Sequence, residues 1–327
     1  MPRPRYSRAC ECGCGEYTQG GRFRPGHDAK LKGNLLRIAR DPQSSTYLRD
    51  WAIGELTRLG WLHFYLYQPQ TVRSSTPRVF DPAKRKFGVE IEFLHNGRTG
   101  SEIVEALRAT GLQAAYESYN HRTRRHWKLT TDGSLQGAGF ELVSPVLSGK
   151  AGMQQLKKAC QALANMGCKI DRRCGLHVHH EIRDLTVQDV ARVVRSYTNN
   201  QGSINGFLAP SRRHNEYCMP WSDSDFSRLD NIAAMNQIHE GTFSRRLAVN
   251  LSSFPRYGTM EFRQHQGSIE FEKISKWIEF TRSLINESIT QQAVFADWRE
   301  WAQDHDLRSY IVERQRQFYN RAQTVAV

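Results

Sequence analysis

Residues 86–94, KFGVEIEFL, have the alternating pattern of a β-strand, and this alternation constrains the fold more than any other feature of the sequence. Successive side chains of a strand point to opposite faces of its sheet. Glu90 and Glu92 therefore share one face, and the apolar residues between and beside them share the other. Such a strand fits a sheet that buries one face and carries acidic groups on the opposite face.

The same pattern recurs in two later segments. His177 and His179 alternate with apolar residues in CGLHVHHEI, and Glu261 and Arg263 do so in GTMEFRQH. Any one of these pairs could simply be the polar side of a half-exposed strand, but such sides favour mixtures of Lys, Thr and Ser. Three strands with Glu/Glu, His/His and Glu/Arg pairs instead indicate one face that gathers ionisable groups.

A fourth segment, TTDGSLQGAGFELVSP, adds two carboxylates, because Asp132 leads a turn and Glu141 lies in a strand. Carboxylates gathered on one face of a sheet repel one another unless cations neutralise them, and hard divalent cations prefer oxygen ligands. The residues therefore indicate a divalent metal site that handles phosphate. His177 could bind the metal or a phosphate, and Arg263 could stabilise the charge that develops during a transfer reaction.

Charge narrows the class of partner. The 327 residues include 46 Lys and Arg against 33 Asp and Glu, a formal net charge of +13 that favours nucleotides, nucleic acid or acidic substrates. Arginines near the chain ends could equally form a solvated surface.

No run approaches the roughly 18 apolar residues of a membrane helix. MPRPRYSRAC lacks the apolar core of a signal peptide, so we expect a cytoplasmic protein without a membrane partner.

The composition along the chain predicts two folded units joined by a linker. Residues 1–68 form a small Cys-rich and helical module, 69–85 a linker rich in Pro, Ser and Thr, 86–290 the main domain, and 291–327 a C-terminal helical extension. Short connections between strand pairs favour an α+β fold, an antiparallel sheet with helices on one side. We expect strands at 87–94, 112–117, 126–131, 139–145, 175–181, 246–252 and 258–265. We expect helices at 28–40, 45–62, 100–110, 149–166, 186–208, 272–290 and 294–318, with a long loop at 209–244.

The N-terminal module contains a second candidate metal site. Cys10, Cys12, Cys14 and His27 supply the ligand types of a structural zinc ion, although C-x-C-x-C spacing is tighter than in common zinc fingers. Seven cysteines, an odd number, argue against a secreted disulfide framework. The alternative is a flexible cysteine-rich tail in which His27 and Asp28 cap the following helix.

Four segments in order, FGVEIEF, DGSLQGAGFELVSP, CGLHVHH and MEFRQ, resemble the amidoligase family of the glutamine synthetase-like carboxylate–amine ligases. The resemblance covers about residues 86–290. It implies a mostly antiparallel curved sheet that binds ATP and two or more Mg²⁺ ions. In this family reaction, ATP phosphorylates a substrate carboxylate to an acylphosphate, and an amine then displaces the phosphate to leave an amide or peptide bond.

The resemblance also implies roles for single residues. Glu90 and Glu92 would bind the two metals, with Glu141 as a third carboxylate, and Glu261 would complete the second metal site. Arg263 would be catalytic and would face the transferred phosphoryl group. His177 would be a metal ligand or a catalytic contact to phosphate, and His179 beside it would have a catalytic or nucleotide-binding role. Asp132 would be a further carboxylate of the nucleotide site or would cap its turn.

Other functions stay open at this level. HVHHEIRD is similar to the H-x-H-x-D-H zinc pattern of metallo-β-lactamases but lacks the Asp and the final His of that pattern. A basic nucleic-acid-binding protein, with 308–323 as an amphipathic binding helix, is an alternative, as is a ligase that modifies a nucleotide or nucleic-acid base. The acidic face would repel a phosphate backbone unless metals were present. The motifs do not encode the carboxylate and amine substrates; Arg212, Arg213, His214 and Asn215 could bind a carboxylate or form a surface turn.

Overall fold

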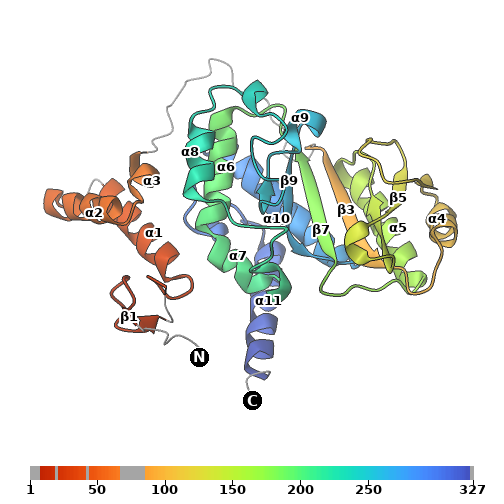
Figure 1. Ribbon diagram of the computed structural model, residues 1–327, viewed down its shortest axis with the longest axis horizontal. Helices are drawn as coiled ribbons and strands as arrows, with labels where there is room; N and C mark the ends of the chain where they lie inside the picture. The colour runs from red at the N-terminus through yellow and green to blue at the C-terminus, as the bar shows by residue number, and fades with distance from the viewer. Residues whose placement is uncertain (1–7, 19–20, 42–43, 67–84, 325–327) are drawn as a thin grey trace, which may run out of the picture.

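The computed structural model describes residues 8–18, 21–41, 44–66 and 85–324, and a seven-stranded sheet dominates it (Figure 1). The strand order is β4-β5-β6-β3-β7-β9-β8; β4 and β5 are parallel, and every other neighbouring pair is antiparallel. This arrangement confirms the predicted α+β class. The strands are β3 Phe87–Leu94, β4 Ala114–Tyr116, β5 Trp127–Thr131, β6 Gly139–Val143, β7 Gly175–Glu181, β8 Val249–Asn250 and β9 Thr259–Gln266.

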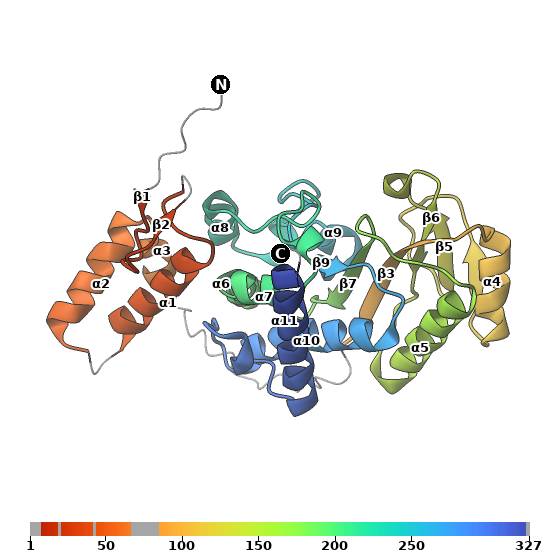
Figure 2. The same ribbon diagram turned by 90° about the horizontal axis from the view of Figure 1, so that it is seen from below.

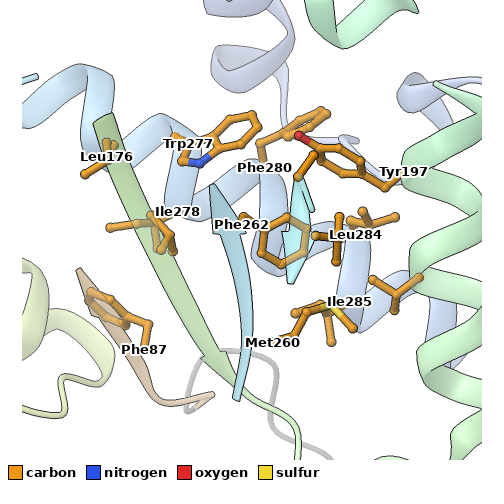
Figure 3. Packing of buried hydrophobic residues seen from close by; sticks show 14 of the residues in the cluster. Phe87, Leu176, Tyr197, Met260, Phe262, Trp277, Ile278, Phe280, Leu284 and Ile285 are labelled. Atoms are coloured by element: carbon orange, nitrogen blue, oxygen red, sulfur yellow. The ribbon is translucent and has the colours of Figure 1, made fainter. Parts of the chain in front are cut away.

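Helices cover the apolar face of this sheet, and α5 and α10 run along the same side of it (Figure 2). Figure 3 shows this core, in which side chains of α10 meet side chains of the sheet: Trp277, Ile278, Leu284 and Ile285 from the helix, and Leu176, Met260 and Phe262 from β7 and β9. The α-helices after β3 are α4 Gly100–Ala109, α5 Gly149–Asn165, α6 Val187–Asn199, α7 Gln201–Phe207, α8 Asp223–Asp230, α9 Phe254–Tyr257, α10 Phe271–Thr290 and α11 His305–Thr324.

Local sequence explains where several of these elements begin. Thr99 and Glu102 form a reciprocal capping box at the start of α4, and Thr186 and Asp189 do the same for α6. Gly139, the first residue of β6, is required by a close approach, because a Cβ at this position would lie 2.3 Å from the backbone oxygen of Phe93. The capping boxes define where α4 and α6 begin, and Gly139 allows β6 to approach β3 closely.

The N-terminal module is a separate small unit. It comprises β1 Arg8–Ala9, β2 Tyr17–Thr18, α1 His27–Arg40, α2 Thr46–Arg58 and α3 Leu62–Leu66. Its α1 and α2 pack together through Leu35, Ala52 and Leu56, which are all buried. It contacts the main domain where the ring of Phe64 lies 5.9 Å from that of Phe226 in α8. The predicted linker, 69–85, lies outside the described residues except for Arg85.

The structure corrects several predicted elements. The helix expected at 45–62 ends with α2, because Gly60 adopts a left-handed conformation with φ of 76° before α3 begins. The helix expected at 186–208 divides into α6 and α7 at Asn200, whose side chain bonds the oxygens of Ser196 and Phe295.

Three other expectations differ in extent. The strand expected at 246–252 is reduced to the two residues of β8, and the loop at 209–244 contains α8 and the short 3₁₀ turns Pro210–Arg212 and Met235–Gln237. The helix expected at 294–318 is instead the 3₁₀ turn Trp298–Glu300 followed by α11. Among the described residues, no helix combines the length and apolar character needed to cross a membrane.

Substitution of Leu156 in α5 tests the helix layer. Leu156 is fully buried, so Leu156→Ala should lower the free energy of unfolding by about 2–5 kcal/mol through lost apolar contacts and a residual cavity. Gln154→Ala, an exposed position in the same helix, should change it by less than about 0.5 kcal/mol. Urea unfolding followed by circular dichroism measures both; equal effects of the two changes would contradict this packing.

Candidate active site

The ionisable residues singled out in the sequence lie on one face of the sheet. In the strand register, Glu92 of β3 is opposite Glu141 of β6, and Glu90 is opposite His177 of β7. His179 is opposite Glu261 of β9. Four adjacent strands therefore place these side chains next to one another, on the face opposite the helix-covered core.

A cavity of about 680 Å³ lies over this face, within the size range of small-molecule sites. All eight predicted residues of the acidic face line it: Glu90, Glu92, Asp132, Glu141, His177, His179, Glu261 and Arg263. Cys10, Cys12, Cys14 and His27 are not among its lining residues; they gather separately in the N-terminal module. The chain thus contains two distinct clusters of metal-ligand side chains.

His177 lies at the centre of the acidic face and is almost fully buried. Its Nδ1 is 3.0 Å from Oε2 of Glu90 and 3.5 Å from Oε1 of Glu261. Its Nε2 is 3.7 Å from Oε1 of Glu92. One imidazole therefore lies within 3.7 Å of three carboxylates, two from β3 and one from β9, and so links both halves of the cluster.

His179 lies between Glu90 and Glu261. Its Nδ1 is 3.0 Å from the Thr259 hydroxyl, which orients the ring. Its Nε2 is buried and has no hydrogen-bond partner among the described residues, although it lies 3.4 Å from Glu90 Oε1 and 3.9 Å from Glu261 Oε1. A buried nitrogen that faces two carboxylates without bonding either is suited to share a cation with them.

Glu92, Glu141 and Asp132 form the other half of the cluster, with one oxygen of each within 4.8 Å of the others. Glu92 Oε2 accepts a 2.6 Å hydrogen bond from the backbone N–H of Gly175, which fixes this carboxylate. Asp132 Oδ1 accepts from the backbone N–H of Ser134 at 2.7 Å. Asp132 therefore caps its turn and also faces the acidic cluster. The two predicted roles of this residue, as a turn cap and as a carboxylate of the site, are compatible.

The pKa shifts of the carboxyl groups follow their neighbours. Burial, together with the negative charges of Glu90 and Glu92, raises the pKa of Glu141 well above its ordinary value. Burial alone would also raise the pKa of Glu90, but the neighbouring imidazoles of His177 and His179 outweigh it and lower that pKa well below the ordinary value. Without cations, the histidines compensate one side of the cluster and leave Glu141 unfavourable in its charged form.

Glu261 and Arg263 form an ion pair on β9, and Asn250 of β8 donates a 2.6 Å hydrogen bond to the second oxygen of Glu261. Burial disfavours ionisation of Glu261, but the charge of Arg263 outweighs it, so the pKa of Glu261 is lowered. Arg263 Nε also donates to the backbone oxygen of Tyr217 at 3.2 Å. The guanidinium thus lies at the cavity in a fixed orientation.

A β-bulge positions this pair. Leu176 and Val178 of β7 pair with His265 and Phe262 of β9, so β9 holds one extra residue opposite His177. His265 consequently lies on the buried side, where its ring is 5.3 Å from that of Trp277 in α10, although strict alternation after Phe262 would place it on the acidic face. Such bulges commonly redirect side chains next to active sites.

The structure adds residues that sequence analysis did not select. Lys128 of β5 and Asn250 of β8 lie on the same face, and Thr259 orients His179. The alternation of Lys128 and Thr130 in WKLTT could have predicted that Lys128 lies on this face. Asn250 lies in a two-residue strand, too short for an alternating pattern.

Of the four loop residues considered for carboxylate binding, only Arg212 lines the cavity. It is buried and donates to the backbone oxygen of Arg263 at 2.7 Å. The guanidinium of Arg213 instead lies 6.0 Å from the ring of Phe318, and His214 and Asn215 are not among the lining residues. Arg212 therefore holds the backbone of Arg263 in position at the cavity.

The donor set fits divalent cations. Three overlapping groups each bring their ligand atoms within 4.8 Å of one another: Glu90, His179 and Glu261; Glu90, Glu141 and His177; and Glu92, Asp132 and Glu141. Carboxylate oxygens dominate all three groups, as Mg²⁺ and Mn²⁺ prefer. The buried Nε2 of His179 and the mutual repulsion at Glu141 are the features that a cation would relieve.

A mostly antiparallel sheet with this carboxylate-rich face and an overlying cavity defines a candidate enzyme of the α+β class. Residues 83–285, more than half of the chain, match the family described as "Putative amidoligase enzyme", and the protein belongs to this family. The resemblance inferred from the four sequence motifs is thus confirmed. The family assignment supports a carboxylate–amine ligase.

Comparison with solved structures shows similarity to the crystal structure of the complex between prokaryotic ubiquitin-like protein Pup and its ligase PafA. The TM-score is 0.32 at 10% identity, and the match covers 73% of this chain and 58% of that chain. Among curated proteins, none matches the sequence.

Replacing Glu141 by Gln tests the charge balance. The raised pKa of Glu141 means that the folded state loses stability as the pH rises through that pKa, because ionisation brings a third negative charge beside Glu90 and Glu92. Glu141→Gln should therefore raise the melting temperature in EDTA at pH 8, and this gain should shrink as the pH falls toward the ordinary pKa of glutamate. The same change should reduce the rise in melting temperature that Mg²⁺ or Mn²⁺ produces.

Differential scanning fluorimetry measures both effects. Glu105→Gln, the same change at an exposed position of α4, is the control and should alter neither value. A Glu141→Gln protein that melts lower in EDTA, or that keeps the full metal-dependent rise, would show that Glu141 is not a repelled carboxylate of a metal site.

Proposed function

We propose that this protein is an ATP- and Mg²⁺-dependent carboxylate–amine ligase that acts through an acylphosphate. The observation that carries the proposal is the arrangement of Glu90, Glu92, Glu141, His177 and Glu261 on one sheet face under a 680 Å³ cavity. The family assignment supports the ligase class. ATP, a carboxylate and an amine are the proposed substrates.

Glu90, Glu92, Glu141, His177 and Glu261 would hold Mg²⁺, with Asp132 beside Glu92 and Glu141. When bound, the cations neutralise phosphate oxygens and favour charge build-up during phosphoryl transfer. The chain itself fixes the ligands before any substrate arrives, because the Gly175 N–H holds Glu92 and the Asn250 amide holds Glu261. Such preorganisation lowers the reorganisation needed at the moment of reaction.

Arg263 supplies the positive side chain closest to this chemistry. Its guanidinium is paired with Glu261, bonded to the Tyr217 carbonyl and backed by Arg212, so its position does not depend on substrate. We assign it to the γ-phosphoryl group as that group moves to the substrate carboxylate. His177 and His179, in contact with the same carboxylates, would keep the ligands oriented and contact phosphate.

The reaction balances as two steps. A carboxylate oxygen of the substrate bonds to the γ-phosphorus of ATP while the bond to the β-phosphate oxygen breaks and ADP leaves. The amine nitrogen then bonds to the acyl carbon, the bond from that carbon to the phosphate oxygen breaks, and the amine loses its proton. The released phosphate therefore carries one oxygen that came from the carboxylate.

The cavity rim offers binding groups for an anionic substrate. Arg122 and Arg245 line the cavity and are exposed, and no ion pair to either is formed within the described residues. Arg212 bonds the backbone oxygen of Arg263, and the remaining arginines of the cavity pair with neighbouring acids, as Arg256 does with Glu240 at 2.8 Å. We assign Arg122 and Arg245 to the substrate carboxylate or the nucleotide phosphates, which a guanidinium binds in a bidentate way.

Loss of a metal ligand should remove turnover. Glu92→Ala should lower Mg²⁺- or Mn²⁺-dependent ATP turnover by about 10²-fold or more, the scale of losing one preorganised electrostatic group at a reacting phosphate. Glu105→Ala, at an exposed position of α4, should leave turnover unchanged. Phosphate release measured with a panel of acids and amines tests the pair. A folded Glu92→Ala protein with full metal-dependent turnover would show that the site is misassigned.

Isotope transfer tests the acylphosphate. Product mass spectrometry with ATP, Mg²⁺ and the same panel first identifies a consumed carboxylate. With both oxygens of that carboxylate labelled by ¹⁸O, one label should appear in the released phosphate. Arg263→Ala should slow this transfer by about 10²–10³-fold, because the developing phosphoryl charge loses its cation.

Arg213→Ala is the matched control, since Arg213 belongs to the neighbouring loop but is not among the residues lining the cavity. Unlabelled phosphate formed while the carboxylate is consumed would contradict an acylphosphate. Release of AMP and pyrophosphate would indicate an adenylate-forming ligase instead.

A further inference from the structure

The N-terminal module brings three cysteines and one histidine to a single point. The ligand atoms of Cys10, Cys12, Cys14 and His27 all lie within 4.8 Å of one another. Sγ of Cys12 is 3.3 Å from Sγ of Cys10 and 3.1 Å from Nδ1 of His27. A tetrahedral Zn²⁺, with sulfur at about 2.3 Å and nitrogen at about 2.0 Å, separates its ligands by about 3.5–3.8 Å. We propose that these four side chains form a structural zinc site.

The backbone of the β1–β2 hairpin builds one side of this site. Cys10 N–H donates to the oxygen of Glu16 at 2.7 Å, and Gly13 N–H donates to the oxygen of Cys10 at 3.1 Å. Gly13 and Gly15 have φ of 77° and 79°, a conformation that strains other residues. The tight C-x-C-x-C spacing is therefore accommodated by a turn in which glycines alternate with or follow the ligands.

The start of α1 supplies the other side. His27 is the first residue of α1, directly after Gly26 at φ of 81°. The backbone N–H of Arg24 points to Sγ of Cys10 at 3.3 Å, and the backbone N–H of His27 donates to the oxygen of Arg24 at 3.0 Å. A backbone N–H aimed at a ligand sulfur stabilises a metal-bound thiolate. Two separate segments thus converge with a supporting hydrogen bond already in place.

The small size of the module gives the metal a physical purpose. Units of this length bury little apolar surface, and small domains commonly gain stability from a disulfide, a metal or a partner. The apolar core of α1 and α2 is short, and all seven cysteines are free. A metal that joins Cys10 of the hairpin to His27 of α1 would attach the hairpin to the helices.

The donor atoms select zinc rather than the cations proposed for the acidic face. Three sulfurs and one nitrogen form a closed tetrahedral set without an oxygen ligand, which is typical of structural zinc and unsuited to Mg²⁺. Four protein ligands leave no position for a substrate or water. The site is therefore assigned to the stability of the module and not to the ligase reaction.

Metal analysis of the full chain tests the proposal. Protein purified without chelators should contain about one zinc per chain, and Cys12→Ser should reduce this to near zero. Glu92→Gln should retain the zinc, which separates this site from the acidic face. Exchange with Co²⁺ should give the visible absorption of a tetrahedral thiolate complex in the wild type and in Glu92→Gln.

Because Cys12→Ser could unfold the module, Cys14→His provides a second readout. Cys14 is exposed, and histidine is also a zinc ligand, so this variant should keep about one zinc and shift the Co²⁺ absorption. Zinc below about one tenth per chain with no Co²⁺–thiolate absorption would overturn the proposal, as would full zinc retention in Cys12→Ser. A disulfide between Cys10 and Cys12 in anaerobically purified protein would overturn it as well.

Discussion

Mutual repulsion among buried and half-buried carboxylates is the constraint around which the main domain is organised. Glu90, Glu92 and Glu141 come from two neighbouring strands, and the register places Glu92 directly opposite Glu141. Like charges in this position destabilise a sheet by an amount that grows as water is excluded. The histidines of β7 offset part of the repulsion on one side, whereas the positive charge of Lys128 does not outweigh burial and the charges of Glu90 and Glu92 at Glu141, whose pKa is raised. The acidic face therefore lowers the stability of the sheet when no cation is bound, as expected of a metal-binding site and not of a surface selected for stability alone.

The opposite face of the same strands makes this arrangement sustainable. Val89, Ile91 and Phe93 are fully or almost fully buried, and α10 covers the neighbouring strands with aromatic and aliphatic side chains (Figure 3). The burial of this face stabilises the sheet independently of what lies on the other side. The strand period of two connects the two faces, because a register slip of one residue would bury the acids and expose the core. Core packing and the position of the candidate site are therefore specified by alternating residues of the same strands.

Strand alternation was enough to predict the acidic face, because it depends only on local periodicity. It predicted that Glu90, Glu92, His177, His179 and Glu261 share one face of the sheet. The strand register shows that they also lie next to one another. The bulge in β9 could not be predicted in this way, since it depends on how β9 meets β7. The contacts of Arg263 escaped prediction for a similar reason: the Tyr217 carbonyl and Arg212 come from a segment about 50 residues earlier, expected to be a loop. Helix ends at Gly60 and Asn200 were missed because apolar periodicity continues across both breaks.

The two proposed metal sites differ in donor chemistry, and this difference would let one chain keep different cations apart. On the acidic face, oxygen donors dominate and the ligands line an open cavity, so bound cations could still exchange ligands with phosphate. In the N-terminal module, sulfur donors dominate and the set is complete in itself. Hard cations have little affinity for the second set, while zinc binds thiolate strongly and would be drawn away from the first. Separation in donor chemistry, together with placement in different units of the fold, would leave the acidic face available to the cations that accompany a nucleotide.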